Sequence, residues 1–331
     1  MYSLPKTIRH IPLALLLLSL ALISCDTSDN LPVIHVDSQE RLPDTALQKE
    51  QAQQDKDIRQ AQDKIFYFGF DLRRSPQEDA AQYLPFLKYL EAATGYQFKL
   101  HFTPKSSTTV EELGQNKTQF AAMGASSFLD AQSMYGAISL VRGLNHQGKA
   151  VYQSVFVVKP NSRIRDISDF KGRGLAFGSR DSTQGHLIPR IMLTENGISL
   201  KDLSSYAYMG SHQNCAEAVV AGRFDICGMQ DKLAEELAAG GYVKIIHRSR
   251  DYPSSGIVAS GLLPAEVIAR VRQALLDFDP QGKHRQNLYH WDKTEMPKGF
   301  VEAMEGDYVD LRQWSIRLGF MQDNHGPGPA Q

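Results

Sequence analysis

The sequence predicts an α/β protein of two lobes, in which each lobe is a mostly parallel β-sheet flanked by helices. From residue 64 onward, short apolar segments typical of buried strands alternate with longer segments whose apolar residues recur at helical spacing. Such alternation favours parallel strands with covering helices. It runs in two series, which apolar segments at 152–159 and 256–260 would connect as crossing strands. We therefore expect lobe 1 to comprise residues 64–155 and 256–331, and lobe 2 to comprise residues 156–255.

The first 25 residues predict a bacterial lipoprotein signal. Lys6 and Arg9 precede an apolar or small run at 11–23, which is too short to span a bilayer as a helix. The sequence LISC ends this run and resembles a lipobox, in which Cys25 receives the lipid. An uncleaved anchor and a plain secretory signal are the alternatives. We expect a signal peptide at 1–24 and a protein anchored through Cys25 in the bilayer, on the periplasmic face of the inner membrane.

Residues 25–63 predict a tether between the lipid and the lobes. They are rich in Asp, Gln, Lys and Ser and nearly free of aromatic residues, so they cannot bury enough apolar area to offset chain entropy. Strong helix formers at 45–64 predict that the tether is partly helical.

The charge and the cysteine content narrow the function classes. Lys and Arg total 36 against 37 Asp and Glu, which gives no basic field for nucleic-acid binding. Besides Cys25, only Cys215 and Cys227 are present, and they would form either a disulfide in the oxidising periplasm or a pair of buried thiols. Neither lies in a CxxC motif or in a metal-ligand spacing, so we expect no metal and no cofactor.

The first series starts with an apolar strand at 65–70 (IFYFGF). A turn, LRRSP, leads to a helix at 78–94, which Gly95 would end as a C-cap. The series continues with a strand at 98–102, a short helix around 110–113, a strand at 119–123 and a helix that opens with the sequence GASS at 124–127.

The second series follows the crossing strand at 152–159. Its expected strands are 174–177, 206–209, 224–229 and 243–246, and its expected helices are 167–170, 187–196, 214–221 and 232–239. In sheets of this kind, ligands bind beyond the carboxyl ends of the strands, where the following helices begin. Polar residues at those points are therefore the first candidates for a binding site.

The most informative of these points is the sequence SRDSTQGH, before the helix at 187–196. Ser182 and Thr183 add hydroxyl donors to the unpaired amides of a first helical turn, where the helix dipole is positive. Gly185 would let the backbone approach a ligand closely. A small oxoanion would find several donors here without a lysine, and His186 is a further candidate ligand. The alternatives are that Ser182 is an ordinary N-cap and that His186 is a surface or core residue.

Three segments carry a resemblance to a known family. They are LAFGSRDSTQGHLIPRIMLTENGI, which is the most specific, GSHQNCAEAVVAGRFDICGM, and FGFDLRRSPQEDAAQYLPFLKYLEAATGYQFKL. They resemble the phosphonate-binding proteins, the periplasmic components of phosphonate, phosphite and phosphate-type ABC importers. The resemblance runs from about residue 66 to about residue 260. It implies a two-lobed clamp of the type II periplasmic-binding-protein class, with the ligand in the cleft between the lobes.

The resemblance also implies roles for residues of lobe 2. Ser182 and Thr183 match the hydroxyls that hold the phosphonate oxygens, and Gly185 matches a glycine that gives backbone access. His212 matches a histidine that faces the cleft. A charged imidazolium would strengthen binding to a dianion, so affinity would change near the histidine pKa of ~6.5.

Further candidates come from other parts of the chain. Ser126 and Ser127 lie where lobe 1 supplies its own donors at the start of a helix, and Tyr152 begins the crossing strand. Asp231 roughly matches an acid that meets the ligand's amine in aminoalkyl-phosphonate binders, although this alignment needs a one-residue gap.

Two departures from the family pattern change the expected ligand. Gln184 replaces a serine, and its longer amide alters the shape of the pocket. The loop at 252–255 holds hydroxyls where aminoalkyl-phosphonate binders carry an acid. We therefore expect phosphate, phosphite or methylphosphonate in preference to 2-aminoethylphosphonate.

These features predict a solute-binding lipoprotein that delivers a small phosphorus oxoanion to an ABC permease. One alternative keeps the clamp but presents its closed form to a membrane sensor. Another keeps the fold but changes the ligand to a sulfonate or a thiamine precursor. A hydrolytic triad of Ser182, His212 and Asp225 is a third alternative, although the sequence has no G-x-S-x-G motif.

Overall fold

The computed structural model describes residues 65–73 and 75–322. The predicted signal peptide at 1–24, the predicted lipidation at Cys25 and the predicted tether lie outside these residues, so they stay predictions. Among the described residues, no helix combines the length and the apolar character that crossing a bilayer requires.

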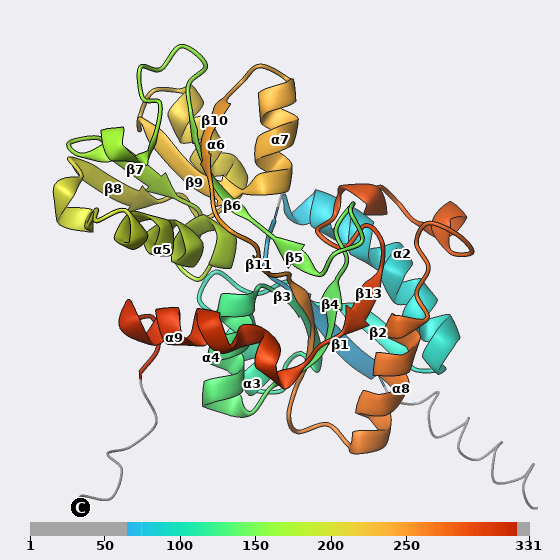
Figure 1. Ribbon diagram of the computed structural model, residues 1–331. Helices are drawn as coiled ribbons and strands as arrows, with labels where there is room; N and C mark the ends of the chain where they lie inside the picture. The colour runs from blue at the N-terminus through green and yellow to red at the C-terminus, as the bar shows by residue number, and fades with distance from the viewer. Residues whose placement is uncertain (1–64, 74, 323–331) are drawn as a thin grey trace, which may run out of the picture. The chain divides into compact units, whose positions relative to one another are not determined.

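Lobe 1 contains a sheet with the strand order β13-β4-β12-β3-β1-β2 (Figure 1). Its strands are β1 (Ile65–Phe70), β2 (Gln97–Leu100), β3 (Phe120–Met123), β4 (Ile138–Gly143), β12 (Gly256–Ala259) and β13 (Phe300–Glu302). Its helices are α2 (Pro76–Thr94), α3 (Thr109–Gly114), α4 (Ala125–Tyr135), α8 (Ala265–Leu276) and α9 (Val309–Arg317). Buried aromatic side chains, among them Phe68, Phe86 and Phe120, form the core that the sheet shares with α2 and α8.

Lobe 2 contains a second sheet with the strand order β10-β6-β9-β7-β8. Its strands are β6 (Ser154–Val158), β7 (Gly174–Phe177), β8 (Ser205–Tyr208), β9 (Ile226–Gln230) and β10 (Lys244–Arg248). Its helices are α5 (Ile188–Glu195), α6 (His212–Val220) and α7 (Asp231–Ala239), and a π-helical turn, Thr183–Leu187, precedes α5.

Both sheets are mixed, whereas the sequence predicted mostly parallel sheets. In lobe 1, β1 is parallel to β2 and β3, but β12 is antiparallel to β3 and β4. In lobe 2, β7 is parallel to β8 and β9, but β6 is antiparallel to β9 and β10. The strands β6 and β12 directly follow the two crossings between the lobes. They therefore enter each sheet from the other lobe and run against the strands of the βα series.

The chain crosses between the lobes at a short antiparallel ladder, which joins β5 (Val151–Tyr152) to β11 (Tyr252–Pro253) (Figure 1). The expected strand at 152–159 is therefore two strands, β5 and β6, with Gln153 between them. Since β6 begins at Ser154, the expected division between residues 155 and 156 falls inside a strand. A pair of adjacent crossing strands is a suitable position for a hinge.

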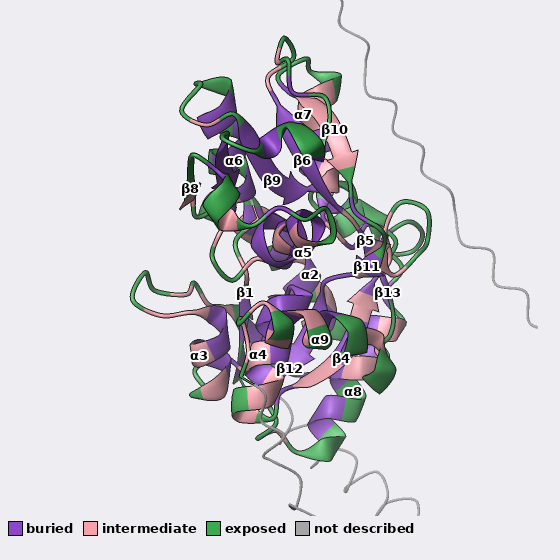
Figure 2. Cartoon of the chain, turned by 60° about the vertical axis from the view of Figure 1, so that its left-hand side comes forward, coloured by how far each residue is buried: buried purple, intermediate pink, exposed green. Residues whose placement is uncertain are grey.

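Buried residues occupy both sheets and the helix faces that are packed on them (Figure 2). One hydrophobic cluster has members in both lobes, among them Met123 and Leu187. An ion pair of 2.5 Å also joins Arg250 of lobe 2 to Asp310 of α9. The two lobes are therefore in direct contact.

Candidate functional site

A pocket of about 260 Å³ lies between the lobes, and we call it the interlobe pocket. The residues that follow the carboxyl ends of β1, β3, β7 and β8 line it, as do residues of the loop at 103–108 and the start of α3. Many of its side chains carry hydroxyl groups: Thr103, Ser107, Thr108, Thr109, Ser127, Ser179, Ser182 and Ser211. The pocket thus lies at the strand ends where such sheets bind ligands.

Ser182 is both an N-cap and a residue of the interlobe pocket. Its Oγ accepts a hydrogen bond of 2.9 Å from the Gly185 amide. The amides of His186 and Leu187 donate to the Ser182 carbonyl oxygen. Several amides of the turn are therefore already hydrogen-bonded within the protein, whereas we expected them to be unpaired and available to a ligand. The Ser182 side chain still lines the pocket, where its hydroxyl proton is available as a donor.

Thr183 joins the two lobes. Its Oγ1 accepts a hydrogen bond of 2.7 Å from the Ser126 amide, in the first turn of α4. Burial raises the pKa of the nearby Tyr152, and the Thr183 hydroxyl and the Ala125 amide oppose this rise. The structure thus brings together three of the predicted site residues, Ser126, Tyr152 and Thr183. The Ser126 amide, however, is bound by Thr183, and none of the three residues lines the interlobe pocket, although the neighbouring Ser127 and Ser182 do.

His212 lies beside Ser182 and is held in one tautomer. Its Nδ1 accepts a hydrogen bond of 3.3 Å from the Gln230 amide, so the ring proton belongs on Nε2. Nε2 lies 3.5 Å from Ser182 Oγ. Burial and the positive charge of Arg73 lower the pKa of His212 to about 3. The structure therefore favours a neutral His212 with an N–H donor over the charged imidazolium that we expected.

Gly185 is needed for packing. A Cβ at this position would lie 2.9 Å from both His212 Cε1 and Ser182 Oγ, and 3.1 Å from Gly178 Cα. Any side chain would displace the two pocket residues, Ser182 and His212. The space that the sequence assigned to a closely approaching ligand is thus filled by the protein itself.

His186 is buried and does not line the interlobe pocket. Its Nδ1 lies 2.7 Å from the Arg180 carbonyl oxygen, and its Nε2 lies 3.0 Å from the Tyr208 hydroxyl. The ring packs against Phe177 and Phe320, and burial lowers the pKa of His186 to about 4. Since both ring nitrogens are bound within the protein, the structure does not favour the predicted ligand contact.

Asp231 and Gln184 face the crossing between the lobes. The Asp231 carboxylate accepts hydrogen bonds from the amides of Gln153 and Lys232 at 3.0 and 2.8 Å. Gln184 Nε2 donates to the Gln153 carbonyl at 2.7 Å and to Asp231 Oδ1 at 3.2 Å. Burial raises the pKa of Asp231 to about 6, against the effect of the two amides. Both residues line a second pocket of about 220 Å³ that does not include Ser182. The structure thus places Asp231 with Tyr152 in this second pocket, apart from Ser127 and Ser182.

Arg73 lines the interlobe pocket and was missed by the sequence analysis. Its Nε lies 3.2 Å from Glu295 Oε1, its Nη1 lies 3.8 Å from Asp71 Oδ2, and its Nη2 donates to Ser255 Oγ at 3.3 Å. Burial opposes the charge of Arg73, but Glu295 and Asp71 outweigh burial and raise its pKa. The position of Arg73 just after the end of β1 was the signal that could have found it. Glu295 lies in a late loop and carried no such signal.

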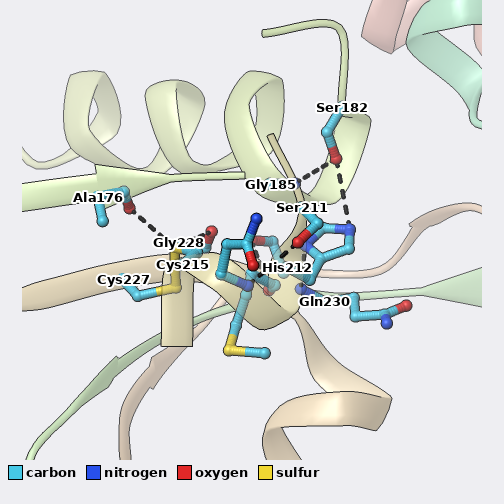
Figure 3. Close-up of a disulfide and its surroundings, with 12 residues drawn as sticks. Ala176, Ser182, Gly185, Ser211, His212, Cys215, Cys227, Gly228 and Gln230 are labelled. Atoms are coloured by element: carbon cyan, nitrogen blue, oxygen red, sulfur yellow. Dashed lines mark hydrogen bonds between the residues drawn. A yellow bond between two sulfur atoms is a disulfide. The ribbon is translucent and has the colours of Figure 1, made fainter. Parts of the chain in front are cut away.

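A disulfide joins Cys215 of α6 to Cys227 of β9 (Figure 3). Cys215 follows His212 by about one helical turn, and β9 supplies the Gln230 amide that binds the histidine ring. Of the two alternatives that the sequence left open, the structure has the disulfide. It fixes the helix and the strand that together orient His212.

The alternative hydrolytic triad is not assembled. Asp225 precedes the amino end of β9, and its Oδ2 accepts a hydrogen bond of 2.9 Å from the Gly174 amide. His212 Nδ1, which a triad carboxylate would have to bind, accepts a hydrogen bond from Gln230. Within 65–73 and 75–322, no group of three or more His, Cys, Asp or Glu side chains is arranged to hold a metal ion.

Sequence comparison relates the chain to transport proteins. The family model described as "ABC transporter, phosphonate, periplasmic substrate-binding protein" matches residues 68–308. The phosphonates-binding periplasmic protein of Escherichia coli (strain K12) is 27% identical over 207 residues, which are 60% of this chain and 61% of that protein. This chain therefore matches about three fifths of that relative's length. The probable ABC transporter phosphite binding protein PhnD1 of Prochlorococcus marinus (strain MIT 9301) is 27% identical over 268 residues, which are 75% of this chain and 82% of that protein.

Solved structures have the same fold. The structure of PhnD1 from Prochlorococcus marinus in complex with methylphosphonate has a TM-score of 0.70 at 19% identity, and covers 78% of this chain and 99% of that one. A binding protein component of an ABC phosphonate transporter from Pseudomonas aeruginosa has a TM-score of 0.68 at 20% identity. The match covers 77% of this chain and 86% of that one. The predicted type II fold is confirmed, and the comparisons do not support the sensing alternative. The chain belongs to the periplasmic substrate-binding proteins of phosphonate ABC transporters.

Proposed function

We propose that the interlobe pocket binds a small phosphorus oxoanion, such as phosphate, phosphite or methylphosphonate. The observation that carries this proposal is the meeting of two helix starts from opposite lobes beside this pocket. The Ser126 amide there donates to Thr183 Oγ1, and the neighbouring Ser127 and Ser182 line the pocket. Ser182 and His212 add an O–H and an N–H donor, and Ser127 adds a further hydroxyl to the same pocket. Several neutral donors at helix starts are well suited to a buried tetrahedral anion.

An entering oxoanion would take the place of the present contact between the lobes. The Ser126 amide would donate to the anion, and the Thr183 hydroxyl would turn its proton toward it. Each anion oxygen that loses water needs a new donor, because an unpaired buried charge is costly. Since the donors lie on both lobes, the full set is available only when the lobes close about the ladder of β5 and β11. Binding and closure would therefore be coupled.

The closed protein would deliver its ligand to an ABC permease. The names of three relatives refer to phosphonates, phosphite and phosphate, which are tetrahedral oxoanions of one chemical class. The predicted lipid on Cys25 and the predicted tether at 25–63 would hold the protein at the periplasmic face of the inner membrane. Such an anchor raises the effective concentration of the binding protein near its permease.

A thermal-shift panel of phosphate, phosphite, methylphosphonate, sulfate and taurine tests the proposal. A ligand that binds only the folded protein raises its melting temperature. We expect at least one phosphorus oxoanion to do so and taurine to have no effect. The double variant Ser182→Ala/Thr183→Ala should lose the shift. Its ligand-free melting temperature should also fall, because it loses the N-cap hydrogen bond of Ser182 and leaves the Ser126 amide unpaired.

Thr94→Ala is the matched control. It removes a buried hydroxyl that donates to the Leu90 carbonyl at the end of α2, outside the interlobe pocket. This variant should respond to the ligand as the wild type does. A folded double variant with an undiminished response would overturn the proposed site.

A further inference from the structure

Arg73 stands between two pockets. It lines the interlobe pocket and also a smaller one, which Glu295 lines as well. Its side chain is 17% exposed. A Cβ added to Gly124 would lie 3.8 Å from Arg73 Nη2 and 2.9 Å from Thr183 Oγ1. The guanidinium therefore reaches the start of α4, where the oxoanion is proposed to bind.

Two carboxylates flank this guanidinium. Glu295 Oε1 lies 3.2 Å from Nε, and Asp71 Oδ2 lies 3.8 Å from Nη1 while it accepts a hydrogen bond from the Gly124 amide. The Glu295 side chain is 11% exposed, and its Oε2 has no hydrogen-bond partner among the described residues. A buried carboxylate needs an opposite charge beside it, because its own burial is costly. Arg73 supplies that charge.

We propose that Arg73 determines which charge a ligand of the interlobe pocket can carry. This inference rests on the proposed function, since it concerns the same pocket. Arg73 offsets one of the two negative charges of Glu295 and Asp71, which lowers the repulsion on an oxoanion that binds beside them. It also engages both carboxylates, so neither is available to an ammonium group of the ligand. Asp181 and Lys105 also line the pocket and contribute one charge of each sign. The geometry at Arg73 therefore favours oxoanions without a cationic substituent over aminoalkyl phosphonates.

Removal of the guanidinium should reverse this selection. Without Arg73, the Asp71 carboxylate, which binds the Gly124 amide at the start of α4, and the Glu295 carboxylate would both lack their cation. They would then repel a simple oxoanion and attract an ammonium group. The substitution R73A would also open space next to Glu295. A zwitterionic ligand such as 2-aminoethylphosphonate would then gain affinity relative to methylphosphonate.

Titration calorimetry with these two ligands measures the effect. We expect the wild type to prefer methylphosphonate. The ratio of the Kd for 2-aminoethylphosphonate to the Kd for methylphosphonate should fall at least about tenfold in Arg73→Ala. The double variant Arg73→Ala/Glu295→Gln should lose most of this gain. Arg142→Ala is the control, because Arg142 is 16% exposed and forms an ion pair with Asp307 outside the interlobe pocket. It should keep the wild-type ratio.

The outcomes separate this inference from the proposed function. If the wild type binds neither ligand nor phosphate, both fall. Two other results overturn only the role of Arg73. In the first, the wild type binds methylphosphonate but a folded Arg73→Ala variant keeps the wild-type ratio. In the second, the wild type binds 2-aminoethylphosphonate as well as it binds methylphosphonate. Should Arg73→Ala not fold, Glu295→Gln in the otherwise unchanged chain decides. This substitution removes one negative charge beside Arg73. The ratio of the Kd for 2-aminoethylphosphonate to the Kd for methylphosphonate should therefore rise above the wild-type value, and any other result overturns the inference.

Discussion

At the interlobe pocket, the hydrogen bonds that a residue already makes inside the protein decide which group it offers to a ligand. His212 and His186 are both buried, but only His212 keeps a ring N–H toward Ser182, because Gln230 binds its other nitrogen. His186 has both nitrogens bound by neighbours. Residue type alone therefore does not distinguish a histidine that lines the pocket from one that is buried away from it.

The fixed tautomer of His212 predicts that its titration does not influence ligand binding. A pKa of about 3 leaves the ring neutral throughout the ordinary pH range. We compare the Kd for methylphosphonate of the wild type with that of His212→Gln. The ratio of the two values should stay constant from about pH 5.5 to about pH 8, because titration of the ligand affects both proteins alike. Calorimetry checks this. A ratio that changes about tenfold as the pH falls through ~6.5 would mean that the imidazolium is the bound form.

The packing around Gly185 predicts a large effect of one methyl group. In Gly185→Ala the new Cβ would meet His212 and Ser182 at 2.9 Å, so both would have to move. Overpacking of this kind costs about 1–3 kcal/mol of unfolding free energy, and methylphosphonate binding should weaken as well. Urea unfolding and calorimetry measure the two effects. Gly306→Ala is the control, since its Cβ would meet nothing within 4 Å. Equal behaviour of the two variants would contradict the assigned role of Gly185.

At the scale of secondary structure elements, the site is assembled where helices begin. The start of α4, the π-helical turn before α5 and the start of α6 all follow carboxyl ends of strands, and each contributes to the interlobe pocket. The helix α6 is attached to its sheet by the disulfide as well as by packing, since Cys215 is bonded to Cys227 of β9. Its first residue, His212, is thereby held in place.

The disulfide predicts a measurable loss of stability on its removal. The two cysteines are separated by 12 residues. In the chain-entropy model, a loop of this length gives about 2–3 kcal/mol of stabilisation. Cys215→Ala/Cys227→Ala should lose this amount in urea unfolding and should bind methylphosphonate more weakly, because the start of α6 is less well fixed. Wild type under reducing conditions should behave in the same way. A double variant as stable as the oxidised wild type would refute this prediction.

At the scale of the whole molecule, several non-covalent contacts join the lobes. They include the hydrogen bond from Ser126 to Thr183, the ion pair of Arg250 with Asp310 and a shared hydrophobic cluster. The chain itself crosses between the lobes twice, where β5 pairs with β11. A ligand can stabilise the closed arrangement only through contacts that the open arrangement lacks.

Ligand-induced closure predicts a smaller radius of gyration. Small-angle scattering of the wild type should show compaction when methylphosphonate is added, because the anion takes donors from both lobes. Ser182→Ala/Thr183→Ala lacks two of these donors and should give the same curve with and without the ligand. Compaction of both proteins to the same extent would show that closure does not depend on these hydroxyls.

The sequence by itself determined the order of the elements and the points where polar residues follow strands. The expected strands at 65–70 and 174–177 agree with β1 (Ile65–Phe70) and β7 (Gly174–Phe177) to the residue. The expected C-cap Gly95 ends α2 with a φ of 76°. These features depend on apolar periodicity and capping, which involve only neighbours within a few residues. The hydroxyls of Ser182 and Thr183 were found for the same reason.

Only the tertiary structure decided which groups meet. It pairs Arg73 with Glu295 from the last part of the chain, places the Gln230 amide on His212 and directs Thr183 to the amide of Ser126 in the other lobe. It also makes β6 antiparallel to β9 and β12 antiparallel to β3, because both strands enter their sheet from a crossing between the lobes. Such contacts depend on how distant segments are brought together, which local sequence patterns do not specify. For this reason the hydroxyl groups at the helix starts could be placed from the sequence, whereas the charges, tautomers and partners around them could not.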